Sequence, residues 1–395
     1  MANILLGFLQ GILNHPLVVG FYLLIIILLI AFRKKFTFQG KIIALYRTKL
    51  GLGLMDAIAG KHRELVKLFG YIGIGAGFLS MFYILFVLAQ SVITLLTVPG
   101  TPAPLSPVLP GVRIPGVPEG FFIPFIQGII AIFVIAVVHE FAHGVVARAH
   151  DIKIKSSGPA IIGPIFAAFV EPDEAQMKRK DDVANLSVFA AGTFSNIVLT
   201  VLILLVMGIV FAPLNAHVFQ DVGVTVTKVE PGFPAAASGL PEGFKIAALN
   251  GENVNSSMDA RTILSYARPG QTMDFSDGSA HYAVTATKHP NNARQGYFGI
   301  VMQPVIKHQN SIVFKTYSWI AELLRLIMML SVGIGLANMI PAGPLDGGKM
   351  LHLALRRVRG EGQANKNLIQ VSIVILIVVI FLLSPIFKAI LKAIF

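Results

Sequence analysis

The sequence contains no cysteine and few charged residues. With no cysteine among 395 residues, a disulfide framework and any Cys-ligated metal site are excluded. Charged residues make up 13% of the chain and hydrophobic residues 55%, whereas soluble globular proteins carry about 25% charged residues. This balance predicts a chain that lies largely in lipid, and it leaves histidine and carboxylate as the ligands for any metal.

The positive net charge of +12 does not indicate nucleic-acid binding. Lysines and arginines form short clusters next to apolar stretches, including Arg33–Lys35, Lys178–Lys180 and Arg356–Arg359. Clusters in such positions are typical of the cytoplasmic loops of membrane proteins, and no nucleic-acid-binding motif accompanies them. We therefore expect a lipid bilayer around the chain and no nucleic acid as a partner.

The hydrophobic pattern predicts a polytopic α-helical membrane protein with about six transmembrane helices. A span needs roughly 20 mostly apolar residues. The basic clusters all fall on one side of the membrane if residues 213–306 lie outside, so the protein is expected in the cell (cytoplasmic) membrane. The first stretch is predicted to be a span and not a cleavable signal peptide, because its basic cluster follows the apolar run. The six stretches are 13–32, 70–98, 121–147, 184–212, 323–345 and 368–390.

This topology divides the chain into four regions. Residues 1–120 form a transmembrane hairpin with a proline-rich outer loop, and 121–212 begin the membrane core. Residues 213–306 form a soluble domain on the extracytoplasmic side, and 307–395 complete the core with the last span. The soluble domain is predicted to be β-rich, because it has alternating apolar residues and an Asn250-Gly251 turn.

Residues 157–170 are apolar but are interrupted by Gly158, Pro159, Gly163 and Pro164. Non-helical backbone at membrane depth must be buried in protein or line a wet cavity. We expect a re-entrant β-like loop that holds an unwound substrate strand, with Gly158 and Gly163 as substrate-binding positions. The alternative is a plain cytoplasmic loop.

The third stretch carries the H-E-x-x-H motif His139-Glu140-Phe141-Ala142-His143 toward its inner end. Residues four apart share one face of a helix, so both imidazoles could bind one metal ion and Glu140 could reach a metal-bound water. Ionisable residues within a span are costly and usually functional. The alternative is that these residues mark the water interface or pair with each other.

A catalytic zinc site usually has three protein ligands and one open position. Asp346 is the candidate for the third, because it follows an apolar stretch in a segment broken by two prolines and three glycines. We expect it on irregular backbone at the depth of His139, although an aspartate in such a turn is more often explained by turn chemistry alone. Asn338 and Asn196 are candidate donors to an oxyanion, or they form interhelical hydrogen bonds.

The motif at His139 and the segment Asn338–Gly348, which fits the pattern N-x-x-P-x-x-P-L-D-G, together resemble the site-2 protease family of intramembrane zinc metalloproteases. The stretch Ala191–Asn196 is similar to that family's G-P-x-x-N stretch, with Thr193 in place of proline. The resemblance covers the chain from about residue 120 onward. It implies a Zn²⁺ cofactor bound by His139, His143 and Asp346, Glu140 as the catalytic base, Asn338 beside the site, and Asn196 as a substrate-binding residue.

The soluble region resembles a PDZ domain of the protease-associated type, on the residues Val229–Leu240 and Leu249–Gly251. PDZ domains bind an extended peptide along a sheet edge. The resemblance implies that peptide ends are partners of this domain and that it reads substrate or gates access. The alternative is a passive spacer or size filter.

The predicted function is therefore an intramembrane zinc endopeptidase that cleaves transmembrane proteins in or near their spans. A first alternative is a membrane zinc protease that uses Glu171 or Glu174 as the third ligand. A second is a membrane anchor without enzymatic activity that presents a PDZ module. A transporter fits poorly, because the spans show no internal repeat.

Overall fold

The computed structural model describes residues 16–39, 43–162, 165–290, 292–307 and 311–394. The chain forms two compact units: Met1–Leu205 together with Glu322–Phe395, and Val206–Ala321. The first contains most of the long helices and one sheet, and the second contains the remaining strands.

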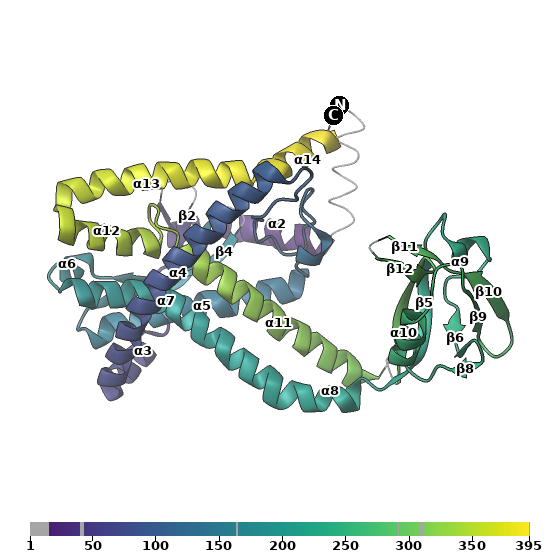
Figure 1. Ribbon diagram of the computed structural model, residues 1–395. Coiled ribbons are helices and arrows are strands. Elements are labelled where there is room, and N and C mark those ends of the chain that lie inside the picture. Colours follow the sequence, from purple (N-terminus) through teal and green to yellow (C-terminus); the bar gives the residue numbers. More distant parts are fainter. Residues whose placement is uncertain (1–15, 40–42, 163–164, 291, 308–310, 395) are drawn as a thin grey trace. The chain divides into compact units, whose positions relative to one another are not determined.

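Within the described residues, five helical segments are long and apolar enough to cross a membrane, which confirms a multi-pass membrane protein (Figure 1). Four of them contain the predicted stretches 70–98, 121–147, 184–212 and 368–390 almost entirely. In the fifth, the helix ends at Asn338, earlier than the predicted 323–345. The five are α4 (Arg63–Thr97), α5 (Phe125–Ala149), α7 (Asp182–Val206) continuing through η3 (Met207–Phe211) into α8 (Ala212–Val218), α11 (Ile312–Asn338), and α13 (Glu361–Leu382) followed by α14 (Ser384–Ile394).

The first predicted span, 13–32, coincides with the shorter apolar helix α2 (Pro16–Ala31). Residues 13–15 lie outside the described residues, so a sixth span stays a prediction.

Helix α4 presents a row of glycines to its neighbours. Gly70, Gly73 and Gly77 are all buried. A Cβ at Gly70 would lie 2.9 Å from Ser187 Cβ, and one at Gly77 would lie 3.0 Å from Met350 Cε. Small residues let membrane helices approach closely, and here they allow α4 to pack directly against α7 and α12 (Asp346–Arg359).

The broken apolar stretch contributes two paired strands, which agrees with the β-like character predicted for it, while its re-entrant placement stays a prediction. Strands β3 (Ile154–Ile162) and β4 (Ile165–Pro172) belong to a four-stranded antiparallel sheet of order β1-β2-β3-β4. Sequence analysis missed β1 (Thr37–Gln39) and β2 (Ile43–Leu45), which are too short to show a period. Strand β4 is an edge of this sheet, whereas β3 is covered on its other side by β2.

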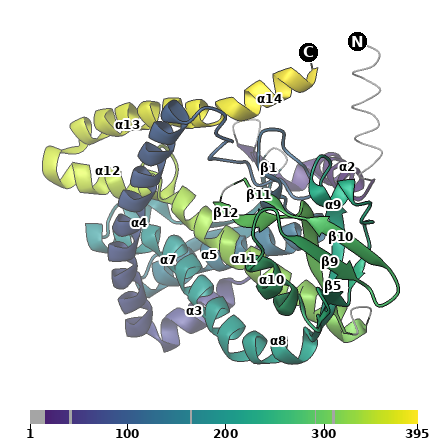
Figure 2. The same cartoon turned by 45° about the vertical axis from the view of Figure 1, so that its right-hand side comes forward.

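Among its described residues, the first unit also contains three helices that were not predicted. Helix α12 is amphipathic and lies beside α13 in both views (Figures 1 and 2). The sequence of α12 is not a long apolar stretch, because its last turn is charged, and it was therefore not predicted. The three are α3 (Leu52–Lys61), α6 (Glu174–Met177) and α12 (Asp346–Arg359), and two short 3-10 turns span Arg33–Lys35 and Glu119–Phe121.

The second unit is rich in β-strands and has its own apolar core, which includes Val226, Leu249 and Phe275. The predicted turn is present: Asn250 and Gly251 both have positive φ and connect β7 to β8. The sheet-containing character of this region is confirmed. Its elements are β5 (Asp221–Val229), α9 (Pro234–Ala237), β6 (Lys245–Ile246), β7 (Ala248–Leu249), β8 (Glu252–Asn253), α10 (Ser257–Ser265), β9 (Thr272–Ser276), β10 (His281–Thr285), β11 (Thr287–His289), β12 (Asn292–Tyr297) and β13 (Ile300–Ile306).

Candidate metal centre

Two imidazoles from one turn of α5 form the start of the site. His139 and His143 are both buried, and their ring centroids lie 4.8 Å apart. Possible ligand atoms of His139, Glu140 and His143 all lie within 4.8 Å of one another. The helical spacing of the motif therefore brings these three side chains together, as the sequence predicts.

Asp346 reaches the same point from a distant part of the chain. Its Oδ2 lies 3.3 Å from His139 Nε2 and 3.2 Å from His143 Nε2. Ligand atoms on a zinc tetrahedron are roughly 3.3–3.5 Å apart, given metal–ligand distances of about 2.0–2.2 Å. The distances from the carboxylate oxygen to the two imidazole nitrogens thus fit a zinc ion bound between them.

The expectation of irregular backbone at Asp346 is wrong. The helix does break between Asn338 and Asp346, but Asp346 is the first residue of α12. The backbone carbonyls of Met339 and Ile340 pack so closely on Gly347 that a Cβ there would collide with them. The glycines after the aspartate therefore allow the turn to fold back onto the start of a helix.

A backbone carbonyl of α7 orients one imidazole. His143 Nδ1 lies 2.6 Å from the Val188 carbonyl oxygen, so Nδ1–H donates to it while Nε2 faces Asp346. Metal-binding histidines commonly have such a second partner. His139 Nδ1 is buried with no hydrogen-bond partner among the described residues.

Helix α7 also leaves space for the site at Gly192. A Cβ at Gly192 would collide with His143 Nε2 and would lie 2.5 Å from His139 Nε2. No larger residue fits there without displacing both rings. The glycine therefore keeps room around the two nitrogen atoms that face Asp346.

Glu140 points to a cleft between α5 and the β3–β4 hairpin. Its Oε2 accepts a hydrogen bond from the Val170 backbone N–H of β4 at 3.0 Å. A cavity of about 330 Å³ lies here, and Glu140, Gly158 and Ala168 are among the residues that line it. The carboxylate is thus placed next to the free edge of the sheet.

Of the two glycines predicted to bind substrate, Gly158 lies within the described residues and Gly163 does not. Gly158 lines the cleft, and a Cβ there would collide with the Tyr46 carbonyl oxygen. This close approach of Tyr46, the residue after β2, is a packing reason for glycine that the sequence did not reveal. Gly163 lies outside the described residues.

The two candidate asparagines lie on different helices. Asn196 of α7 is completely buried, and both polar atoms of its amide lack a hydrogen-bond partner within the described part of the chain. Its side chain is therefore not seen in an interhelical hydrogen bond. Asn338 is the last residue of α11, and its Nδ2 donates to the Ile334 carbonyl of the same helix at 3.1 Å.

Thr193, which occupies the place of a proline in the resembling stretch, joins two helices. Its Oγ1 donates to the Gly335 carbonyl of α11 at 3.1 Å. Ser331 of α11 donates in return to the Asn196 carbonyl at 3.0 Å. These two bonds join α7 to α11.

The alternative third ligands have other surroundings. Glu171 receives two hydrogen bonds from Arg47, at 2.9 and 3.2 Å, and one from Ser156 at 2.6 Å. Glu174 is exposed in the short helix α6. The carboxylate that lies against both imidazoles is that of Asp346.

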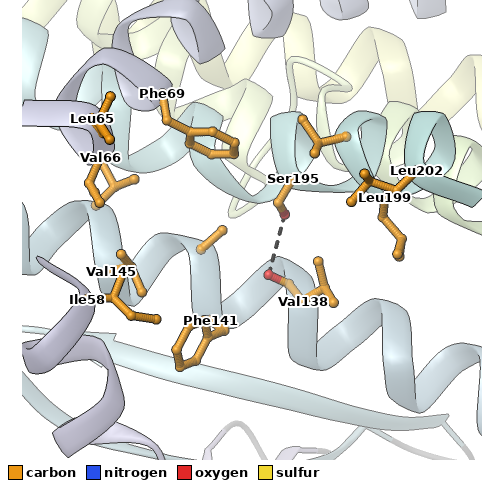
Figure 3. Close-up of a pocket in the computed structure, with 13 residues that line it drawn as sticks. Ile58, Leu65, Val66, Phe69, Val138, Phe141, Val145, Ser195, Leu199 and Leu202 are labelled. Carbon is orange, nitrogen blue, oxygen red and sulfur yellow. Dashed lines mark hydrogen bonds between the residues drawn. The ribbon is translucent and has the colours of Figure 1, made fainter. Parts of the chain in front are cut away.

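A second cavity lies on another face of α5, between α5, α7, α4 and α3 (Figure 3). Its volume is about 480 Å³, and its lining is apolar except for Ser195. The Ser195 hydroxyl is already bonded to the carbonyls of Gly192, at 2.7 Å, and Val138, at 3.4 Å. With no titratable side chain in its lining, this cavity has no group for acid–base chemistry.

Sequence analysis missed two residues that position side chains of the site, Val188 and Val170. Both act through backbone atoms, which leave no mark on residue identity. Gly192 stood in the stretch noted for its resemblance, but only the folded chain gives it a role.

Comparison with known proteins agrees with this geometry. The profile of "Peptidase family M50" matches residues 127–381, which include all four residues of the centre. An uncharacterized protein of Methanocaldococcus jannaschii is 29% identical over 310 residues, covering 78% of this chain and 76% of that protein.

Bacterial relatives carry more informative names. The "Zinc metalloprotease RasP" of Bacillus licheniformis is 26% identical over 239 residues, and the "Regulator of sigma-W protease RasP" of Bacillus subtilis is 24% identical over 240 residues. Each alignment covers 49% of this chain and 55% of the relative. The chain thus spans little more than half the length of these two proteins.

Proposed function

The chain belongs to peptidase family M50 and is a zinc metalloprotease, and from this premise we propose that it is an intramembrane endopeptidase. Its proposed substrates are transmembrane proteins, cleaved in or near their membrane-spanning segments. The observation that carries the proposal is the meeting of Asp346 with His139 and His143 beside Glu140. The two histidines and the glutamate lie on α5, a helix apolar enough to cross a membrane.

In this proposal the metal ligands are His139, His143 and Asp346, and Glu140 is the base. A zinc ion bound there would polarise the scissile carbonyl and lower the pKa of water. Glu140 takes a proton from the attacking water and returns it to the leaving amine. The Val170 N–H holds Oε2 of Glu140, so that Oε1 is left to face the water.

Asn196 is the proposed donor to the substrate carbonyl oxygen. A buried amide without partners costs free energy, on the order of 1–3 kcal/mol, and a substrate oxygen would satisfy it. Asn338 is the less favourable donor, because its amide would first have to break its hydrogen bond to the Ile334 carbonyl.

We further propose that substrate binds as a strand along β4. Ser157 exchanges hydrogen bonds with Thr48, and the Pro159 carbonyl accepts one from Tyr46. Their partners in β4, Val170 and Ala168, therefore turn their own N–H and C=O groups away from β3. An unwound substrate could satisfy its backbone groups at the Ala168 position, which lipid cannot do.

The second unit is proposed to bind peptide ends as a PDZ-like domain on the extracytoplasmic side. Strand β13 is the edge of the sheet β13-β5-β6, and α10 packs against both β5 and β13. A helix beside a free strand edge supports peptide binding by strand addition.

The test compares wild type with Glu140→Gln for zinc content and for cleavage of a model transmembrane substrate. We expect the variant to retain zinc and to lose at least about 100-fold in cleavage rate, because it removes the base but no ligand. Glu174→Gln is the matched control and should preserve both properties. Full cleavage by Glu140→Gln would overturn the mechanism.

A further inference from the structure

Lys349 makes a contact with the metal centre that the proposed reaction does not use. Its Nζ lies 3.1 Å from Asp346 Oδ1, while Oδ2 of the same carboxylate faces the two imidazoles. The two residues are three apart on α12, so they lie on one face of the helix. The ammonium therefore binds the carboxylate oxygen that points away from the centre.

The Lys349 ammonium is itself restrained from a second side. It lies 5.3 Å from the centre of the Phe189 ring, a distance at which a cation is attracted to an aromatic face. Phe189 directly follows Val188, whose carbonyl orients His143. One turn of α7 thus reaches both a histidine and, through Lys349, the aspartate.

The Lys349 and Asp346 side chains differ in their exposure to water. The Asp346 side chain is only 9% exposed, whereas that of Lys349 is 45% exposed. Water can therefore reach the lysine more readily than the carboxylate. Without the lysine, Oδ1 would lose its bond to the ammonium, and the carboxylate could rotate about its last bond and turn Oδ2 away from the imidazoles.

We propose that Lys349 is a positioning residue that fixes the orientation of Asp346 for zinc binding, and this rests on the proposed role of Asp346 as a ligand. It acts through the aspartate and need not touch substrate. Groups that orient a ligand typically change metal affinity about 10-fold to 100-fold when removed.

Orientation and simple charge repulsion predict opposite signs. A positive charge near a cation weakens its binding, so loss of the lysine charge alone would make zinc bind more tightly. Loss of orientation would make zinc bind more weakly. The direction of the change in affinity therefore decides between the two.

The experiment measures zinc dissociation constants by chelator competition, on the full-length protein in detergent. Lys349→Met keeps the apolar stem and removes the donor, and we expect zinc to bind about 10-fold to 100-fold more weakly. Lys349→Arg retains charge and N–H donors and should stay within about threefold of wild type. Lys366→Met, an exposed residue of α13, is the matched control and should have no effect.

Unchanged or tighter zinc binding by Lys349→Met would overturn the proposal, as would equal weakening in Lys349→Arg. If Lys349→Met does not fold, Phe189→Leu decides, because it frees the ammonium without changing charge. It should weaken zinc binding severalfold, and unchanged affinity would refute the restraint. Failure of the ligand assignment itself is distinguishable, because Asp346→Ala would then leave zinc binding intact.

Discussion

Replacing Gly192 by alanine tests the geometry of the metal centre with a single methyl group. The new Cβ would collide with His143 Nε2 and lie 2.5 Å from His139 Nε2 and 2.6 Å from its Cε1. Comfortable contacts are about 3.5–4.0 Å, so the His139 ring must move by roughly 1 Å. His143 must also move, although its Nδ1–H is bonded to Val188 on the same helix as Gly192.

The expected effect on zinc is large and the expected effect on folding is small. A 1 Å misplacement in an active site can cost about 100-fold in reaction rate. Both imidazoles are displaced here, so we expect zinc affinity to fall by a similar factor, at least about 100-fold. Alanine favours a helix over glycine by about 0.5–1 kcal/mol. The metal-free variant should therefore melt close to wild type, while zinc should no longer raise its melting temperature.

The assay combines chelator competition for zinc, thermal melting with and without zinc, and cleavage of a transmembrane substrate. Gly333→Ala is the matched control, because it makes the same change in a membrane helix where nothing lies within 4 Å of the new Cβ. Wild-type zinc affinity in Gly192→Ala would show that the rings do not occupy the space described.

Two further predictions concern the sheet. Ala168→Pro removes an N–H that faces away from β3, so we expect the hairpin and zinc binding to survive while cleavage falls at least about tenfold; unchanged turnover would remove β4 from substrate binding. Hydrogen bonds from Arg47, and next from Ser156, hold the pKa of Glu171 below its ordinary value. The ionised carboxylate therefore stabilises the fold at neutral pH. This stabilisation is lost as the pH falls through the lowered pKa. Arg47→Met should raise the pKa of Glu171 toward its ordinary value. The melting temperature of the variant should then fall less steeply between about pH 6 and pH 3 than that of wild type. Parallel curves of melting temperature against pH would contradict Arg47 as the cause of the lowered pKa.

The parts of the protein that local patterns encode were predictable. The long helices follow from continuous apolar stretches, and the meeting of His139 with His143 follows from helical spacing. Asp346 was also predicted, because the segment before it breaks the helix at a matching position along the membrane.

The parts that depend on distant backbone were not predictable. No residue type marks the Val188 carbonyl as the partner of His143, or the Val170 N–H as the partner of Glu140. Strands β1 and β2 have three residues each, too few to display alternation. Strand β2 pairs with β3 and β1 pairs with β2, so that β4 is left as the edge next to α5.

The two halves of the metal centre are made at different times. His139 and Asp346 are 207 residues apart, and the whole second unit lies between them in sequence. At a synthesis rate of about 5–20 residues per second, roughly 10–40 s separate the two. A nascent chain that has inserted α5 but not yet made α12 lacks the carboxylate proposed as the third ligand. With Asp346 in that role, the protease is expected to stay inactive toward its neighbours in the membrane until α12 has been synthesised.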